Sequence, residues 1–136
     1  MSPPRDWGPL GAPGEWLRHA RSDLALARLG QQSGDILAGQ ICFHAQQAAE
    51  KALKAALLAE AIPFPLTHDL EILLQLAREN RLELTAEFDD LAQLTPYAVA
   101  VRYPGYAHAV SIAEVEEAIR LAEQAVAWAA ELLHDV

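Results

Sequence analysis

Apolar residues recur at three- and four-residue intervals along most of the chain, which is the period of a helix that buries one face. A first helix is expected over residues 15–32. Its apolar face is formed by Trp16, Ala20, Leu24 and Ala27. A second, unusually long helix is expected over residues 36–61, with Asp35 as its N-cap. This helix is rich in alanine, which favours helix formation and allows a neighbouring helix to approach closely.

The middle of the chain predicts two shorter helical segments. A third helix is expected to begin at Thr67, a good N-cap, and to end near Arg81. A fourth helical stretch begins at Thr85. Within that stretch, Thr95-Pro96 fits either a kink or a new helix with proline at its first position, and the sequence favours neither.

The last helix has the clearest start, because Ser111 and Glu114 have the spacing of a capping box. Two apolar stripes follow along this helix. The first consists of Val115, Ile119, Ala122, Val126, Ala129 and Leu133. The second consists of Ala118, Leu121, Ala125, Trp128 and Leu132. One stripe is enough to fill the core of a domain, so we expect the other to face a partner chain. Since no segment alternates like a strand, the predicted fold class is all-α.

Length and composition indicate one small globular domain. The 136 residues suffice for a single core. Prolines and glycines crowd residues 1–14, so we expect an extended arm there and one helical domain over residues 15–136. The chain has no apolar run long enough for a membrane helix, no secretory signal, and a single cysteine, Cys42, that has no partner for an internal disulfide. These features predict a cytoplasmic protein that does not bind a membrane.

The formal net charge of −9 argues against broad, sequence-independent binding of nucleic acids. Such binding needs many lysine and arginine side chains to displace counterions. The charge still leaves room for a local basic site on an acidic body. The residues available for it are Arg18, Arg21, Arg28, Lys51, Lys54 and Arg102.

One face of the second helix carries His44, Gln47 and Lys51, which stand at positions i, i+3 and i+7. An imidazole, an amide and an ammonium group in line suit a phosphate or a nucleotide. The alternative is a solvated helix face with ordinary i,i+4 side-chain pairs. Those pairs would involve Gln46, Glu50 and Lys54. Taken alone, the pattern favours the alternative.

Neither a metal nor another cofactor is expected. His19 and Asp23 stand four residues apart on the first helix, and His68 adjoins Asp69, yet no third and fourth ligand follows at a suitable spacing. The chain also has no glycine-rich phosphate loop and no zinc motif.

The second helix contains the segment Phe43-His44-Ala45-Gln46-Gln47-Ala48-Ala49-Glu50-Lys51-Ala52-Leu53-Lys54. The other segments of interest are Trp16-Leu17 through Asp23-Leu24-Ala25, then Thr67-His68-Asp69-Leu70, and Arg102-Tyr103-Pro104. Together these segments resemble the HEPN family (higher eukaryotes and prokaryotes nucleotide-binding), and the first of them resembles the second-helix signature of that family. The resemblance covers about residues 15–134. It implies an antiparallel bundle of about five helices, a four-helix up-down core plus a short extra helix, that usually forms a homodimer.

The resemblance also implies an activity, because many members of the family are metal-independent ribonucleases with arginine, four to six residues, and then histidine. Arg102 and His108 have five residues between them. In an unbroken helix these positions would point about 120° apart and be separated by about 9 Å of rise. Pro104-Gly105 interrupts the helix and allows the two side chains to converge. Arg102 would then bind the scissile phosphate, and His108 would exchange protons with the ribose 2′-hydroxyl.

Two functions are therefore expected from the sequence. The first is a ribonuclease toxin that pairs with an antitoxin of the nucleotidyltransferase type. The second is a non-catalytic module that binds a nucleotide or dimerises, and assists a separate nucleotidyltransferase. The residues expected to bind RNA or a nucleotide are His44, Gln47, Lys51, His68, Tyr103 and Tyr106. Two positions depart from the family pattern: Tyr103 replaces a small polar residue common in active members, and Val110 replaces a tyrosine that partner enzymes modify.

Overall fold

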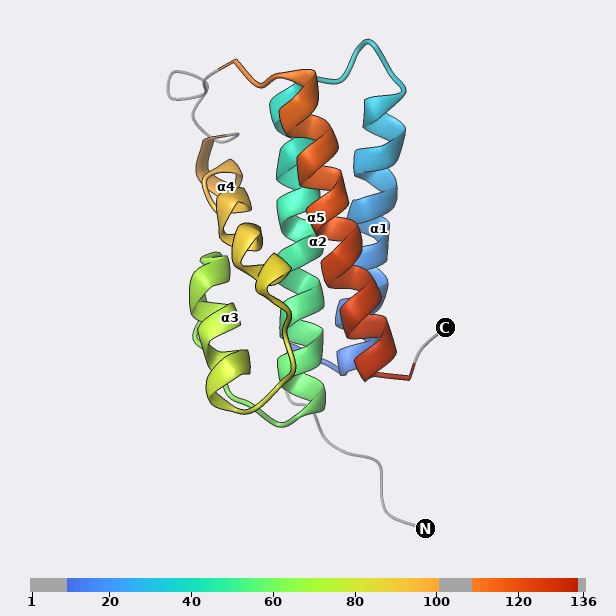
Figure 1. Ribbon diagram of the computed structural model, residues 1–136. Helices are drawn as coiled ribbons and strands as arrows, with labels where there is room; N and C mark the ends of the chain where they lie inside the picture. Colours follow the sequence, from blue (N-terminus) through green and yellow to red (C-terminus); the bar gives the residue numbers. More distant parts are fainter. Residues whose placement is uncertain (1–9, 101–108, 135–136) are drawn as a thin grey trace.

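The computed structural model describes residues 10–100 and 109–134, and these residues contain helices and connecting loops but no strand. The elements, in chain order, are α1 (Pro13–Gln31), α2 (Ala38–Ala59), α3 (Leu70–Glu79), the 3-10 helix η2 (Ala86–Leu94), α4 (Tyr97–Ala100) and α5 (Ile112–Leu132). The three long helices lie side by side, and α1 runs in the opposite direction to α2 and α5 (Figure 1). The predicted all-α class is confirmed.

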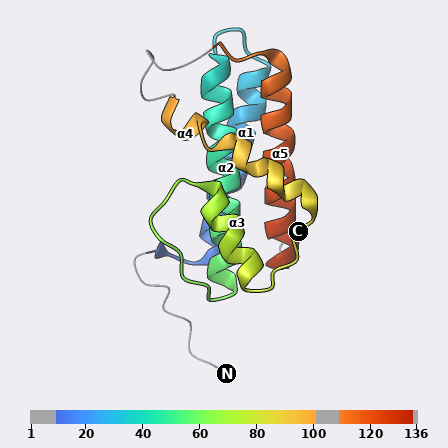
Figure 2. The same ribbon diagram turned by 60° about the vertical axis from the view of Figure 1, so that its left-hand side comes forward.

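The core lies between the long helices. The side of α2 that packs there is made of small residues with no exposed surface, which lets its neighbours approach closely. These residues are Ala45, Ala48, Ala49, Ala52 and Ala56. The segments α3, η2 and α4 cover another side of α2 (Figure 2). In the part of the chain that the structure describes, no helix is long and apolar enough to cross a lipid bilayer.

Most residues of both apolar stripes of α5 are buried within the chain itself, and Trp128, Leu132 and Leu133 are partly buried. In the second stripe, Ala118, Leu121 and Ala125 are at most 1 % exposed. Trp128 of the same stripe packs on Phe88 of η2, with 5.6 Å between the ring centroids. The prediction that one whole stripe faces a partner chain is therefore wrong for Ala118, Leu121 and Ala125, because this chain itself buries them.

Two predicted N-caps are also corrected. The N-cap of α2 is Leu37 rather than Asp35, and it makes no side-chain capping bond. The N-cap of α3 is Asp69, whose carboxylate accepts a hydrogen bond from the Glu71 N–H at 3.0 Å. Thr67, the predicted cap, instead accepts the Asp69 N–H on its hydroxyl oxygen at 3.0 Å.

The boundaries around α4 and α5 answer the open question at Pro96. The stretch that precedes it is a 3-10 helix, and a new α-helix begins at Tyr97, so Pro96 separates two elements. The predicted start of α5 is confirmed, because the Ser111 hydroxyl oxygen accepts a hydrogen bond from the Glu114 N–H at 3.1 Å.

Candidate functional site

A row of polar side chains along α2 is buried. Gln46, Glu50 and Lys54 are 0 %, 3 % and 5 % exposed. They do form the expected i,i+4 pairs: Glu50 accepts hydrogen bonds from the Gln46 amide at 3.2 Å and from the Lys54 ammonium group at 3.1 Å. The expectation of a solvated face is wrong for these three residues. A buried carboxylate needs partners of this kind, because it has lost the hydration that stabilises its charge in water.

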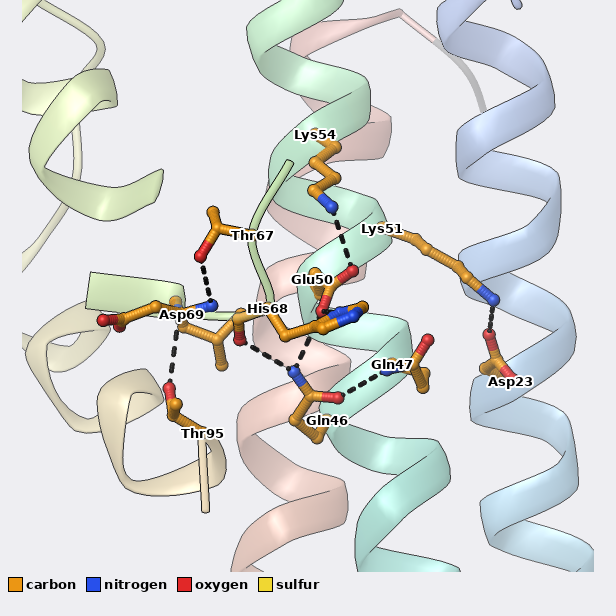
Figure 3. A network of polar contacts seen from close by, with 11 residues as sticks. Asp23, Gln46, Gln47, Glu50, Lys51, Lys54, Thr67, His68, Asp69 and Thr95 are labelled. Atoms are coloured by element: carbon orange, nitrogen blue, oxygen red, sulfur yellow. Dashed lines mark hydrogen bonds and ion pairs between the residues drawn. The ribbon is translucent and has the colours of Figure 1, made fainter. Parts of the chain in front are cut away.

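Two residues of this row, Gln46 and Glu50, also contact His68 in the segment that leads into α3. The imidazole of His68 lies against Glu50, with 2.8 Å between Nδ1 and Oε1, and the Gln46 amide donates to the His68 carbonyl oxygen at 3.2 Å (Figure 3). The His68 side chain is about half exposed. His68 therefore joins a buried carboxylate to the protein surface.

The ammonium group of Lys54 has aromatic neighbours as well as an anion. It lies 5.6 Å from the ring centroid of Trp16 on α1 and 5.7 Å from that of Phe64. The negative faces of aromatic rings attract cations, so these two rings offset part of the cost of burying the charge.

A second polar cluster joins α1 to α2. Asp23, which is 8 % exposed, accepts a hydrogen bond from the Lys51 ammonium group at 2.6 Å, and its other oxygen lies 3.1 Å from Nδ1 of His44. The third residue of the predicted face, Gln47, donates to the Gln46 side-chain oxygen at 2.8 Å. A phosphate at His44 and Lys51 would therefore compete with Asp23 for both groups.

Sequence reasoning missed the role of Asp23, although a signal was present. Asp23 stands three residues after Ala20 and four before Ala27, so it shares the apolar face of the first helix. An acidic residue on a buried face requires a partner. Within the described residues, no group of three or more side chains is arranged to bind a metal ion.

A third polar contact ties α4 to α5. The hydroxyl of Tyr97 donates to Oε2 of Glu114 at 2.9 Å. Burial, together with the hydrogen bond to Glu114, raises the pKa of Tyr97 well above its usual range, so the hydroxyl keeps its proton. The neighbouring Cys42 of α2 is fully buried, which raises the pKa of its thiol to about 11. Cys42 is therefore a thiol at neutral pH and not a reactive thiolate.

Four predicted site residues fall outside the described part of the chain: Arg102, Tyr103, Tyr106 and His108. All four belong to the connection between α4 and α5, and their roles stay predictions. The structure does describe both flanks of this connection, and it brings them together through the contact between Tyr97 and Glu114.

A groove of about 530 Å³ lies where α1 ends and α2 begins, with His44 in its wall. Four aliphatic side chains around it are between 45 % and 73 % exposed. They are Leu26, Leu29, Ile36 and Leu37. Contiguous aliphatic surface of this kind is typical of protein interaction sites.

The fold and its contacts define a small helical-bundle domain with a polar row buried along its central helix, and comparisons with known proteins identify the class. The protein-family model described as the HEPN domain matches residues 14–133. The chain belongs to the HEPN domain family. No curated protein matches it.

Two solved structures are similar. One is TT1696 from Thermus thermophilus, with 29 % identity, a TM-score of 0.73, and coverage of 88 % of this chain and 97 % of that one. The other is ST0689, described as an archaeal HEPN homologue, with 23 % identity, a TM-score of 0.70, and coverage of 89 % and 97 %. At its lower identity, the second likeness shows the fold alone.

Proposed function

We propose that this HEPN protein is a metal-independent ribonuclease whose reacting groups are Arg102 and His108. The observation that carries the proposal is their spacing, with five residues between them, in a chain that belongs to this family. An arginine and a histidine are together sufficient for the chemistry: one binds and neutralises a phosphate, and the other transfers a proton near neutral pH.

The described flanks of the connection support the convergence that this chemistry needs. In one unbroken helix, Tyr97 and Glu114 would be separated by about 25 Å of rise. The Tyr97 hydroxyl and the Glu114 carboxylate are instead 2.9 Å apart, and α5 begins as a separate helix after its N-cap at Ser111. The two flanks therefore lie beside each other, which a single straight helix running from α4 into α5 would not allow.

The proposed reaction is attack of the ribose 2′-oxygen on the adjacent phosphorus. The 2′-oxygen–phosphorus bond forms, the bond from phosphorus to the 5′-oxygen breaks, and the products are a 2′,3′-cyclic phosphate and a 5′-hydroxyl. The planar guanidinium of Arg102 stabilises the charge that develops on the phosphate oxygens. His108 accepts the proton of the 2′-hydroxyl. An imidazolium then returns a proton to the leaving 5′-oxygen, and in a dimer this imidazolium belongs to the second subunit.

The proposal includes two partners: a second copy of the chain, and a nucleotidyltransferase-type protein that acts as antitoxin. The aliphatic groove between α1 and α2 supports a protein partner, because a monomer rarely leaves such a surface uncovered. Light scattering on the purified chain tests the homodimer, for which the expected mass is twice that of one chain.

Cleavage of single-stranded RNA tests the reaction. With EDTA present, we expect the wild type to cut RNA, and Arg102→Ala and His108→Ala each to lose at least about 100-fold in rate. The matched controls are Arg120→Ala and His19→Ala, which remove an exposed arginine and an exposed histidine from α5 and α1. Activity that survives both substitutions would contradict the proposal. Saturable nucleotide binding without RNA cleavage would favour the non-catalytic module.

A further inference from the structure

We infer that the aliphatic groove between α1 and α2 is the surface through which two copies of this chain associate. The inference rests on the homodimer that is part of the proposed function, and it deepens that proposal by naming the residues that would meet. The groove residues belong to α1, α2 and the loop between them, and none of them is one of the reacting groups.

The groove lies at the end of the bundle where α1 ends and α2 begins (Figure 1). Gly30 lets the two helices approach closely there, because a Cβ atom at this position would lie 3.0 Å from Cγ1 of Ile41 and 3.2 Å from Cγ2 of Ile36. Ile41 belongs to the hydrophobic core, so the two helices are fixed relative to each other beside the groove. The groove therefore exists in the single chain and needs no partner to form it.

Leu37 occupies an unfavourable position for a chain that stays alone. It is the N-cap of α2, where a serine, threonine, asparagine or aspartate would accept a backbone N–H, and it makes no side-chain capping bond. Its side chain is also 73 % exposed. Residues that break a local rule without a gain inside their own chain are typical of functional sites. Burial of Leu37 by a second chain would supply the missing gain.

Other aliphatic side chains gather around Leu37. Nine large hydrophobic side chains are exposed among the described residues, and four of them line this groove, whereas the other five belong to five different segments. Leu29, in the last turn of α1, is 64 % exposed and lines the groove together with Leu37 at the start of α2. The groove is therefore the place where exposed aliphatic surface is concentrated in the described part of the chain.

The shape of this surface suits a second copy of the chain. In a two-fold dimer the same patch of each subunit meets that of the other, so the patch must be complementary to itself. This one carries exposed leucines beside a hollow of about 530 Å³, and each copy can place its leucines in the hollow of the other.

Charge also favours a second copy at this place. Two chains with a net charge of −9 repel each other, so they can associate only where their surfaces carry little charge. Among the described residues that line the groove, Asp35 is the only acidic one, none is a lysine or an arginine, and the imidazole of His44 is already paired with Asp23.

The size of the patch fits a dimer of moderate affinity. A stable dimer buries roughly 800 Å² on each partner, and the four aliphatic side chains supply about half of this area. Polar residues that line the same groove, namely Ser33, Gln40 and His44, can contribute to the remainder. An apolar centre with a polar edge is the usual composition of such an interface. We therefore expect association at micromolar concentration.

Sedimentation equilibrium of the full chain tests the inference. We expect Leu37→Asp and Leu29→Lys each to raise the dissociation constant of the dimer by at least about 100-fold, because a two-fold interface would contain each new charge twice. The two variants change the net charge in opposite directions, so a loss shared by both is not an effect of net charge. The matched control is Leu66→Asp, which adds the same charge to a 92 % exposed leucine in the segment after α2 and should leave the dissociation constant unchanged.

Thermal unfolding separates loss of the interface from loss of the fold. At a concentration at which both proteins are monomeric, we expect Leu37→Asp to melt at least as high as the wild type, because aspartate is a better N-cap than leucine. Leu29→Lys repeats the test on the other helix, where a positive charge suits the last turn.

The possible results distinguish the inference from the proposed function. Unchanged dissociation constants in both Leu37→Asp and Leu29→Lys would overturn the inference and leave the homodimer standing. An equal loss of dimer in Leu66→Asp would also overturn it, because the position of the charge would then not matter. A wild type that stays monomeric at every concentration would remove the homodimer and the inference together, whereas RNA cleavage by the wild type tests the proposed reaction separately.

Discussion

The buried polar row of α2 is organised around one carboxylate, that of Glu50. Glu50 is 3 % exposed, and it is contacted by the Gln46 amide, the Lys54 ammonium group and the His68 imidazole. Burying a charge is costly, and the cost is recovered only when the geometry of its partners is good. These contacts join α2 to the segment that leads into α3, so they help to position the start of that helix.

Removing the ammonium group should therefore be strongly destabilising. We expect Lys54→Met to lower the free energy of unfolding by about 3 kcal/mol, because Glu50 would remain buried without its cation while the methionine keeps the apolar stem. Urea denaturation measures this difference. The control is Arg18→Met, which removes an ion pair with Glu15 whose side chains are 73 % and 58 % exposed, and which should change nothing measurable. Equal stability of Lys54→Met and the wild type would show that the buried pair contributes no net stability.

At the scale of elements, the start of α3 shows how a tertiary contact moves a helix boundary. Thr67 has the right chemistry for an N-cap, but the next residue, His68, is held on α2 by Glu50 and Gln46. The helix therefore begins two residues later than Thr67 would allow, at the cap provided by Asp69. The Thr95 hydroxyl oxygen accepts the N–H of the first residue of α3 at 3.2 Å, which also ties this helix to the segment before α4.

The sequence predicts Asp35 as the N-cap of α2, whereas the structure shows Asp69 as the N-cap of α3. Substitutions of these two aspartates can therefore be compared directly. We expect Asp69→Ala to lower the free energy of unfolding by about 1 kcal/mol, because the Glu71 N–H would lose its acceptor. Asp35→Ala should change it by much less, because Leu37 is the N-cap of α2. Thermal and urea unfolding, followed by circular dichroism, distinguish the two variants. The reverse order of stability would contradict the assignment of the cap.

At the scale of the whole molecule, three long helices and a covering layer enclose one core, while aliphatic side chains where α1 ends and α2 begins stay exposed. The two apolar stripes of α5 are both used, one toward α1 and α2 and the other toward the η2 side. The division into an arm over residues 1–14 and a domain over residues 15–136 stays a prediction, and α1 begins at Pro13, two residues before the expected start of the domain. Its independence from the N-terminal arm stays a prediction.

A shortened chain tests that independence. We expect a variant that begins at Leu10 to fold with the same helical circular dichroism and the same melting temperature. This start keeps the Leu10 carbonyl oxygen, which accepts the Trp16 indole N–H at 2.6 Å, and all of α1. A melting temperature lower by more than roughly 4 °C, which corresponds to about 1 kcal/mol, would show that residues 1–9 contribute to the core.

Much of this protein is determined by the sequence alone. The period of apolar residues places the long helices to within two or three residues, because a helix buries one face whatever its neighbour is. Ser111 marks the start of α5 because capping is a local interaction. The ordered family segments identify the HEPN domain, and the spacing of Arg102 and His108 carries the proposed chemistry.

Only the tertiary structure decides which polar residues of α2 are buried. Helical periodicity places Glu50 and Lys51 on different faces, but it does not say which face meets another element. Packing buries Glu50 beneath His68 and leaves Lys51 at the edge, paired with Asp23 from α1. The burial of the second apolar stripe of α5 likewise depends on η2, and the hydrogen bond between Tyr97 and Glu114 joins α4 to α5. In both cases the two partners are distant in the sequence. Such contacts depend on how the helices are arranged in space, and a local sequence pattern does not determine that arrangement.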